Sequence, residues 1–306
     1  MSSMREARPA LGFIGAGKVG SALALALADA GYAVVAVASS KLAAARALAA
    51  RIEGCAAAAD PQSVVDRADI VFVTTPAAAI RKVASERRWR PGVAVVHTSG
   101  SEGRDALAAA AAAGAATASL HPLLAFAEVE AARRGLRGAF FAVEAEGPLA
   151  ERLNALVADL GGTPLAVRGA DKALYHAAAV FAGNYVLALL KLASDLWLNL
   201  GFDRELAVSA LLPLMRGALA NAEGQGLAAA LSGPIARGDA ATVQRHIEAL
   251  AATSGSMALL DAYRCLGRAT LPLAAEGGGL TPAAATALRD LLSAPDPSLE
   301  RKQTKA

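Results

Sequence analysis

The pattern of the first 168 residues restricts the fold more than any other feature of the chain. Short runs of apolar, often β-branched residues alternate there with alanine-rich segments of helical length. We expect strands at Leu11–Ile14, Tyr32–Val37, Ile70–Thr74, Val93–His97, Ala116–Leu120, Ala139–Val143 and Pro164–Val167. We expect helices at Lys18–Ala30, Lys41–Arg51, Ala77–Arg87, Asp105–Ala113 and Pro148–Leu160. This alternation predicts a doubly wound α/β domain with a largely parallel sheet, because several strands are apolar on both faces.

The pattern changes near Ala170. Apolar residues then recur at helical spacing, beginning with Leu174, Ala178 and Phe181, and the strand pattern does not return. Further helices are expected at Arg204–Ala222, Ala240–Thr253, Ser256–Thr270 and Pro282–Ser293. The sequence therefore predicts an α/β domain over residues 1–168, an all-helical domain over 169–294, and a disordered tail over 295–306.

Composition excludes several other classes of protein. The chain has 306 residues, 55% of them hydrophobic, and its two cysteines, Cys55 and Cys265, exclude a disulfide framework. Its 30 basic and 27 acidic residues are scattered, which argues against a nucleic-acid partner. The longest apolar runs are short or are interrupted by His176 and Asn184, and the N-terminus has no signal-peptide pattern. We expect a soluble, cytoplasmic protein without a membrane partner.

A glycine-rich turn follows the first expected strand and opens the first expected helix. Its residues are Gly15, Ala16, Gly17, Lys18, Val19 and Gly20. In such a turn the first glycine permits a tight bend and the second lets the backbone approach a pyrophosphate. The third glycine lets the helix pack on the strand. With the helix N-terminus as a source of N–H donors, this motif predicts a dinucleotide-binding site.

The residues after the second expected strand indicate which dinucleotide binds. A carboxylate at this point would hold the ribose 2′-hydroxyl of NAD, but the chain has Ser39, Ser40 and Lys41 instead. Hydroxyl groups and an ammonium suit a 2′-phosphate, so we expect NADP, with NAD as the alternative. Ser40 could instead, or in addition, cap the next helix.

Small polar residues also follow the next two strands of the expected sheet. Thr74, Thr75 and Pro76 end one strand, and the segment His97–Ser101, which contains Ser99, ends the other. Ligands of open α/β sheets bind at this edge, so we expect the first three residues to line the cofactor site and Ser99 to contact substrate. Each residue could equally serve only as a turn or cap.

Three candidates for proton transfer come from two segments. His121 follows a strand, and its ordinary pKa lies near neutrality. Lys172 and His176 are i,i+4 neighbours at the start of the long helix, and Asn184 follows two turns later. Polar groups on a largely buried helix need partners, which a substrate cleft would supply. A structural histidine and a lysine whose ammonium reaches solvent are the alternative.

Two further segments complete the set of candidates. Arg237 could bind an anionic part of the substrate, and Asp239 is placed to cap the helix that follows. His246 is expected to be structural. The four histidines, His97, His121, His176 and His246, do not have the spacing of a metal site, so we expect none.

Together these segments resemble an uncharacterised family of Rossmann-like oxidoreductases whose C-terminal helical domain has no known function. The matching segments are Gly15–Gly20, His97–Ser101, Ser119–Pro122, Lys172–Tyr185 and Gly233–Asp239. More distantly, the chain is similar to pyrroline-carboxylate reductases, prephenate dehydrogenases and β-hydroxyacid dehydrogenases. These resemblances imply a nicotinamide-binding domain and a helical domain of the 6-phosphogluconate dehydrogenase C-terminal type, through which the chain forms a homodimer.

The chain departs from these distant relatives at two points. Lys172 matches a lysine of the β-hydroxyacid enzymes, but His176 stands where they have an asparagine, and Asn184 lies further along. His121 and Pro122 are similar to a His-Pro of prephenate dehydrogenases, yet the residues that follow lack the usual glycine. Neither mechanism is therefore expected to transfer unchanged.

The resulting hypothesis is an NADP-dependent oxidoreductase that transfers a hydride to or from a small-molecule C=O or C=N group. We rank Lys172, then His176, then His121 as the group that handles the proton. Ser99, Asn184 and Arg237 are expected to bind substrate. The alternatives are a nucleotide-binding sensor or scaffold without turnover, and a deazaflavin-dependent NADP reductase.

Overall fold

The computed structural model describes residues 8–253 and 256–294. The chain divides into two compact units, Met1–Asn184 and Tyr185–Ala306, and the division falls within one long helix, α8 (Lys172–Asn199). The boundary expected from the sequence, at residues 168 and 169, lies just before α8. The tail expected to be disordered, 295–306, lies outside the described residues.

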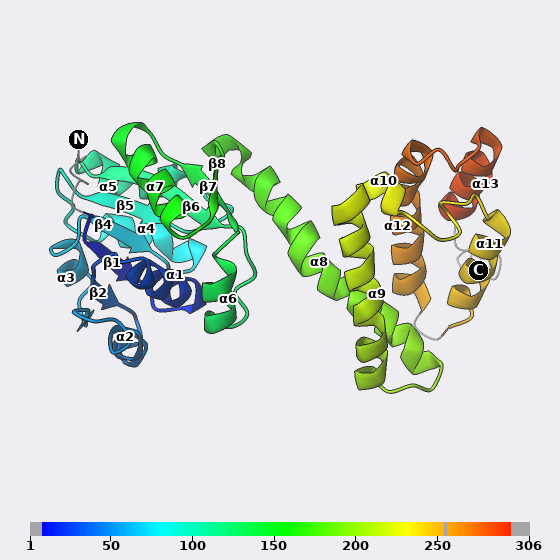
Figure 1. Cartoon of the computed structure of the whole chain (residues 1–306), viewed down its shortest axis with the longest axis horizontal. Coiled ribbons are helices and arrows are strands. Elements are labelled where there is room, and N and C mark those ends of the chain that lie inside the picture. The colour runs from blue at the N-terminus through cyan, green and yellow to red at the C-terminus, as the bar shows by residue number, and fades with distance from the viewer. Residues whose placement is uncertain (1–7, 254–255, 295–306) are drawn as a thin grey trace, which may run out of the picture. The chain divides into compact units, whose positions relative to one another are not determined.

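The first unit contains one sheet of eight strands in the order β3-β2-β1-β4-β5-β6-β7-β8 (Figure 1). Neighbouring strands are parallel except for β6 and β7, which are antiparallel. The strands are β1 Leu11–Ile14, β2 Val34–Ala38, β3 Ala56–Ala58, β4 Ile70–Val73, β5 Ala94–His97, β6 Ala116–Pro122, β7 Phe140–Glu144 and β8 Thr163–Ala166. The order reverses at β1, as in a doubly wound domain.

Helices cover both faces of this sheet and bury two separate apolar clusters. The helices are α1 Lys18–Asp29, α2 Leu42–Ala49, α3 Gln62–Val65, α4 Ala77–Ser85, α5 Ala108–Ala112, α6 Val129–Gly135 and α7 Gly147–Asp159. Phe13 and Phe72 stack on the face covered by α1 and α7, with ring centroids 5.1 Å apart. Val71 and Val73, which point to the other face, pack with residues of α3, α4 and α5. This arrangement confirms the expected doubly wound α/β fold.

The register of the strands aligns the ends that carry the candidate residues. Ile14 of β1 pairs with Val73 of β4, Val73 pairs with His97 of β5, and His97 pairs with Ser119 of β6. Because these four strands are parallel, the segments that follow them leave the sheet at one edge, its carboxyl edge. At about 4.8 Å per strand, that edge spans roughly 14 Å from β1 to β6.

The structure differs from the sequence prediction in a few elements. The strand β3 and the helices α3 and α6 were not expected, and the helix expected at Asp105–Ala113 is a 3-10 turn, Arg104–Leu107, followed by α5. Pro76, whose fixed φ would suit the first residue of a helix, is instead the N-cap of α4. These differences leave the order of the expected elements unchanged.

The second unit is helical throughout its described residues. After the end of α8 it contains α9 Arg204–Gln225, α10 Leu227–Ala230, α11 Ala240–Ala251, α12 Ser256–Glu276 and α13 Pro282–Ser293. Its core gathers Val243 and Ile247 of α11, Leu260 and Leu271 of α12, and Leu288 of α13.

One stretch of the described residues, Gly169–Asn199, has the length and the mean hydropathy, 1.5, of a membrane-spanning helix. Length and composition alone support that similarity. The stretch contains the buried Lys172 near its start and the partly buried His176 one turn later.

Candidate functional site at the carboxyl edge of the sheet

The glycine-rich turn lies between β1 and α1 and has the geometry that the motif predicts. Gly15 has a φ of +123°, a conformation that residues with a side chain rarely adopt. A Cβ on Gly20 would lie 2.5 Å from Thr74 Oγ1, so only glycine fits there. A Cβ on Gly17 would meet no protein atom within 4 Å. The packing of the fold therefore requires Gly15 and Gly20, whereas Gly17 borders space that the protein leaves open.

The N-terminus of α1 is available to an anion. Its N-cap is Gly17, no side chain caps it, and its first turn contains no acidic residue. Lys18 is exposed and Ala16 and Val19 are partly buried around this turn. Backbone N–H groups at a helix start bind phosphate in this setting.

The segment after β2 lies at the same edge of the sheet. Ser39 Oγ accepts a hydrogen bond from the backbone N–H of Lys41 at 3.3 Å. The helix α2 begins after Lys41 without a side-chain cap, so Ser40 does not cap it. Ser40 and Lys41 are both exposed. The capping alternative for Ser40 is thus wrong, which leaves its hydroxyl and the ammonium of Lys41 free to meet a ligand.

The two threonines after β4 differ in their contacts. Thr74 is buried, and its hydroxyl donates to Gly15 O at 2.7 Å, which ties β4 to the glycine turn. Thr75 Oγ1 is buried but has no hydrogen-bond partner among the described residues. A buried hydroxyl without a partner carries an energetic cost, so Thr75 is a candidate contact for a bound ligand.

Lys172, the first residue of α8, is fully buried. Its Nζ donates a hydrogen bond to Ser119 Oγ at 2.5 Å. Burial lowers the pKa of Lys172 to about 8, and the carboxylate of Glu144 opposes that shift. At neutral pH the ammonium is therefore an acid close to its pKa, in contact with a hydroxyl that can pass a proton on.

His121 and His176 lie next to this lysine. The two imidazole rings meet edge to face with centroids 5.9 Å apart. His121 Nδ1 is 2.8 Å from the hydroxyl of Tyr175, and burial, followed by Lys172, lowers the pKa of His121 to about 4. His176 Nδ1 is buried and has no partner among the described residues. The structure thus brings the three proton-transfer candidates together.

His97 holds the loop that follows β5 in place and does not face the site. It is fully buried, its Nε2 donates to Gly103 O at 2.9 Å, and its Nδ1 accepts from the backbone N–H of Ser99 at 3.2 Å. Burial lowers its pKa to about 4, so it stays neutral. Ser99 Oγ accepts the backbone N–H groups of Ser101 and Glu102, at 3.3 and 3.2 Å. Both residues therefore shape the loop after β5.

The remaining predicted site residues lie elsewhere. Asn184 is exposed on α8, eight residues and about 12 Å along the axis from His176, so it does not join the cluster. Arg237 is exposed in the second unit. Nearby, Asp239 accepts the backbone N–H of Thr242 at 3.0 Å and caps α11, as expected. His246 contacts the hydroxyl of Tyr263 at 2.8 Å.

Sequence reasoning assigned no role to Ser119, Tyr175 or Gly100. A signal for the first two was present in the spacing. Ser119 is two residues before His121 on the same strand, so both side chains point to the same face. Tyr175 is three residues after Lys172 on the same helix, so these two also share a face. The role of Gly100 depends on contacts between distant segments, and no local pattern reveals it.

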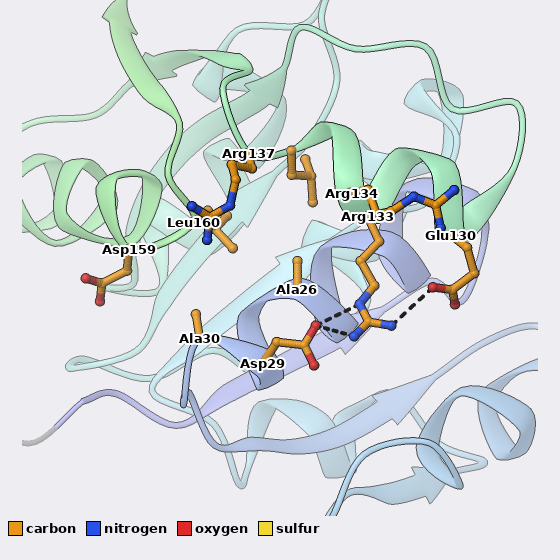
Figure 2. A pocket seen from close by; sticks show the side chains of 10 residues that line it. Ala26, Asp29, Ala30, Glu130, Arg133, Arg134, Arg137, Asp159 and Leu160 are labelled. Carbon is orange, nitrogen blue, oxygen red and sulfur yellow. Dashed lines mark hydrogen bonds and ion pairs between the residues drawn. The ribbon is translucent and has the colours of Figure 1, made fainter.

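A hollow of about 560 Å³ occurs at another place in the first unit (Figure 2). Its lining comes from the C-terminal ends of α1 and α7 and from α6 with the residues that follow it. Arg133 Nε donates to Asp29 at 2.7 Å, and its Nη1 donates to Glu130 at 3.1 Å. Of the six charged residues that line the hollow, Asp29, Glu130 and Arg133 therefore already pair with one another. Among the described residues there is no group of histidine, cysteine and acidic side chains that could hold a metal ion.

Two family models match consecutive parts of the chain. Residues 1–122 match a Rossmann-like domain, and residues 139–270 match a domain of unknown function, DUF2520. Together the two matches run from residue 1 to residue 270, with a gap between residues 122 and 139. The family resemblance seen in the sequence is thereby confirmed. The DUF2520 match begins before β7, so this domain includes the last two strands of the sheet as well as α8.

Solved structures with this fold include proteins of several activities. A Bacteroides fragilis protein proposed to be an NADP oxidoreductase is 23% identical, with a TM-score of 0.67 over 87% of this chain and 98% of its own. The 1-pyrroline-5-carboxylate reductase of Streptococcus pyogenes is 15% identical, with a TM-score of 0.59 over 94% and 99%.

A reductive aminase from Aspergillus terreus, solved with NADPH, is 16% identical, with a TM-score of 0.57 over 98% of this chain and 95% of its own. A search of curated proteins found no match. At these identities the comparisons establish the shared fold.

Proposed function

We propose that this protein is an NADP-dependent oxidoreductase that transfers a hydride to or from a small-molecule C=O or C=N group. The observation that carries the proposal is the cluster of Lys172, His121 and His176, which contacts the same carboxyl edge as the open glycine turn. Such a reaction needs two parts, a binding site for the dinucleotide and groups that transfer a proton, and here both lie at one edge of the sheet.

Three features of the edge fit the cofactor. The space beside Gly17 would admit a pyrophosphate, the uncapped start of α1 would donate N–H groups to it, and Ser40 with Lys41 would meet a 2′-phosphate. Thr75 follows β4, which lies two strands from β2 in the sheet. Its hydroxyl has no hydrogen-bond partner among the described residues and would gain one from the bound cofactor. When bound, NADPH would supply the hydride, and the protein would orient the substrate and control the proton.

Lys172, His121 and His176 have different roles in the proposed proton transfer. Lys172 holds a proton that leaves near pH 8, and its contact with Ser119 provides a hydroxyl through which that proton can move. His121 and His176 are the competing donors. Because burial keeps His121 neutral at physiological pH, it would act as a hydrogen-bond donor or acceptor rather than as a charged acid.

The proposal includes a homodimer formed through the helical part of the chain. Large apolar side chains are exposed along α8 and α9, among them Leu187 at 67%, Leu214 at 69% and Leu219 at 64%. Exposed apolar surface of this kind marks an interaction site, and a second copy rather than a membrane is the occupant that a soluble cytoplasmic protein would use. Sedimentation of the purified protein without detergent should give a dimer, and Leu214→Glu should shift it towards monomer.

The cofactor is tested by titrating the purified protein with NADPH and NADH and following fluorescence. NADPH should bind at least about tenfold tighter, a difference of about 1.4 kcal/mol. Lys41→Ala should remove most of this preference by weakening NADPH alone, whereas Lys82→Ala, on the exposed side of α4, should not. Equal affinities in the wild type would contradict the preference for NADP.

Turnover is tested by following NADPH oxidation with small ketones, with and without added amines. Consumption of NADPH supports the oxidoreductase and distinguishes C=O from C=N substrates. Tight binding of NADPH without consumption across both sets would favour the nucleotide-binding sensor.

A further inference from the structure

A row of polar side chains crosses three neighbouring strands at the carboxyl edge. His97 of β5 pairs with Ser119 of β6, and Ser119 pairs with Glu144 of β7. Residues directly opposite each other on adjacent strands point to the same face, with Cβ atoms about 4.5–5.5 Å apart in an antiparallel pair. Because Ser119 Oγ accepts the hydrogen bond of Lys172 Nζ, the buried ammonium lies at the middle of this row, next to the side chain of Glu144.

The carboxylate of Glu144 contacts two segments that meet beside this lysine. Its Oε2 accepts the backbone N–H of Arg104 at 2.8 Å, where the loop after β5 ends. A Cβ on Gly169, three residues before Lys172, would lie 2.5 Å from its Oε1. The φ of Gly169 is not positive, so packing and not backbone conformation requires glycine there. The carboxylate fills the space that a side chain at position 169 would need.

The loop that Glu144 holds also packs against the two histidines of the site. A Cβ on Gly100 would lie 2.5 Å from His176 Nδ1 and 2.8 Å from His121 Nε2, so both imidazoles lie against the backbone of the loop. His97 bonds to the near end of the loop, and Glu144 bonds to its far end. The carboxylate therefore helps to fix the loop against the histidines as well as against the start of α8.

Glu144 also brings a negative charge to the surroundings of Lys172. The titratable groups around the ammonium come from four elements: His97 of β5, His121 of β6, Glu144 of β7, and Tyr175 and His176 of α8. Burial lowers the pKa of His97 and of His121 to about 4 and raises that of Tyr175 to about 12, so these three are neutral at pH 7. Burial and the positive end of the α8 dipole both disfavour the ammonium, and the carboxylate opposes them.

We propose that Glu144 is a positioning residue of the proton-transfer site: its carboxylate holds the loop after β5 and the start of α8 together beside Lys172 and keeps this lysine in its ammonium form at neutral pH. The inference rests on the proposed function, in which Lys172 transfers the proton. Reduction of a C=O or C=N group needs one proton on the oxygen or nitrogen in addition to the hydride. The ammonium supplies that proton and becomes an amine, so loss of the carboxylate would leave less of the acid at pH 7.

The charge is tested by following the titration of Lys172 directly, through the Nζ and Cε signals of labelled lysine in nuclear magnetic resonance, assigned with Lys172→Met. Glu144→Gln keeps an oxygen for the Arg104 N–H but removes the charge. Glu146→Gln is the matched control, because it removes an exposed carboxylate that pairs with the side chain of Arg104. The midpoint should lie near pH 8 in the wild type and the control, and at least about 0.5 pH unit lower in Glu144→Gln. An unchanged or raised midpoint in Glu144→Gln, or an equal shift in Glu146→Gln, would overturn the proposal.

A conservative variant tests the same charge in a second way. Glu144→Asp keeps the carboxylate on a shorter side chain, so it should return the Lys172 midpoint from the value in Glu144→Gln towards that of the wild type. A midpoint in Glu144→Asp as low as that in Glu144→Gln would show that the charge does not act on Lys172.

The contact with the start of α8 is tested by a double-mutant cycle. Gly169→Ala should lower the melting temperature of the wild type, because its Cβ would press on the carboxylate, and should lower that of Glu144→Ala much less. Gly183→Ala, where a Cβ meets nothing within 4 Å, is the control and should not lower the melting temperature. Equal losses from Gly169→Ala in the two backgrounds would overturn the contact.

The titration needs neither NADPH nor a substrate, so it separates this inference from the proposed function. If the Lys172 midpoint does not fall in Glu144→Gln, the inference fails whatever the turnover. If the midpoint falls but the pH dependence of NADPH oxidation stays where it is, Glu144 acts on Lys172 as proposed, and the role of Lys172 in the proposed function fails.

Discussion

Lys172 Nζ donates a hydrogen bond to Ser119 Oγ at 2.5 Å, which joins the first residue of α8 to strand β6. The residues are 53 positions apart in the chain. The contact fixes the start of α8 against the sheet, and it places Tyr175 and His176, one turn later, beside His121. One buried ammonium thus determines which residues the helix brings to the carboxyl edge.

The lowered pKa of Lys172 predicts a rise in stability at alkaline pH. The folded protein loses this proton near pH 8, whereas the unfolded chain keeps it to about 10.5. Between those values the unfolded chain binds more protons, so the free energy of unfolding increases with pH, by up to about 3 kcal/mol. Urea midpoints measured from pH 7.5 to 10 should show this rise relative to Lys172→Met, which cannot titrate. Parallel curves for the two proteins would contradict it.

The lowered pKa of His97 predicts that the folded protein loses stability at acid pH. The unfolded chain takes up this proton near pH 6.5 and the folded protein only near pH 4. Stability should therefore be complete above pH 6.5 and fall by up to about 3 kcal/mol as the pH approaches 4. The groups that act on this ring besides its burial are Gly103 O, Lys172, Asp105 and Arg81.

The measurement compares urea midpoints of the wild type and of His97→Asn at pH 7 and pH 4.5. The variant is expected to be less stable at pH 7 and to lose less stability between the two values. His246→Asn, at an exposed histidine of α11, is the control and should follow the wild type. An acid loss in His97→Asn as large as that of the wild type would show that other groups cause it.

Most of the fold follows from local patterns, and the exceptions have identifiable causes. The strand β3 consists of three alanines, which favour helix rather than strand, so only its pairing with β2 makes it a strand. The helix α6 is capped by Glu128, whose carboxylate accepts the N–H groups of Glu130 and Ala131; glutamate is not a residue that signals a helix start. The strand β7 runs antiparallel to β6, a direction set by the connection between the two strands and not by the residues of β7 itself.

The candidate site was predictable in part. The rule that ligands bind at the carboxyl edge selects His121 and Thr75, and helical spacing places Lys172 and His176 on one face. Which hydrogen-bond partner each side chain meets was not predictable, because Ser119 and Lys172 are brought together by the docking of α8. Asn184 was selected by residue type, but its distance along the helix separates it from the cluster.

The different surroundings of Gly17 and Gly20 predict different effects of the same change. Gly17→Ala should fold with nearly unchanged stability, because a Cβ there meets no protein atom within 4 Å, but it should weaken NADPH binding at least about tenfold. Gly20→Ala should be destabilised by about 1–3 kcal/mol, because its Cβ would press on Thr74 Oγ1. Thermal unfolding and NADPH titration of both variants test this. Full affinity in Gly17→Ala would place the pyrophosphate elsewhere.

The adjacent threonines provide a final test, in which stability and binding should change in opposite directions. Thr75→Val replaces a buried hydroxyl that has no partner with a methyl group of similar shape, so the free protein should become more stable, by about 1 kcal/mol. If the cofactor or substrate is the missing partner, the same variant should bind NADPH or the substrate less tightly, by about tenfold.

Thr74→Val is the matched control, because it removes a hydroxyl that already bonds to Gly15 O and should lower stability instead. The melting temperature in the absence and presence of NADPH measures both effects. If Thr75→Val were destabilised as much as Thr74→Val, its hydroxyl would have a partner within the folded protein, and Thr75 would no longer be a candidate for ligand binding.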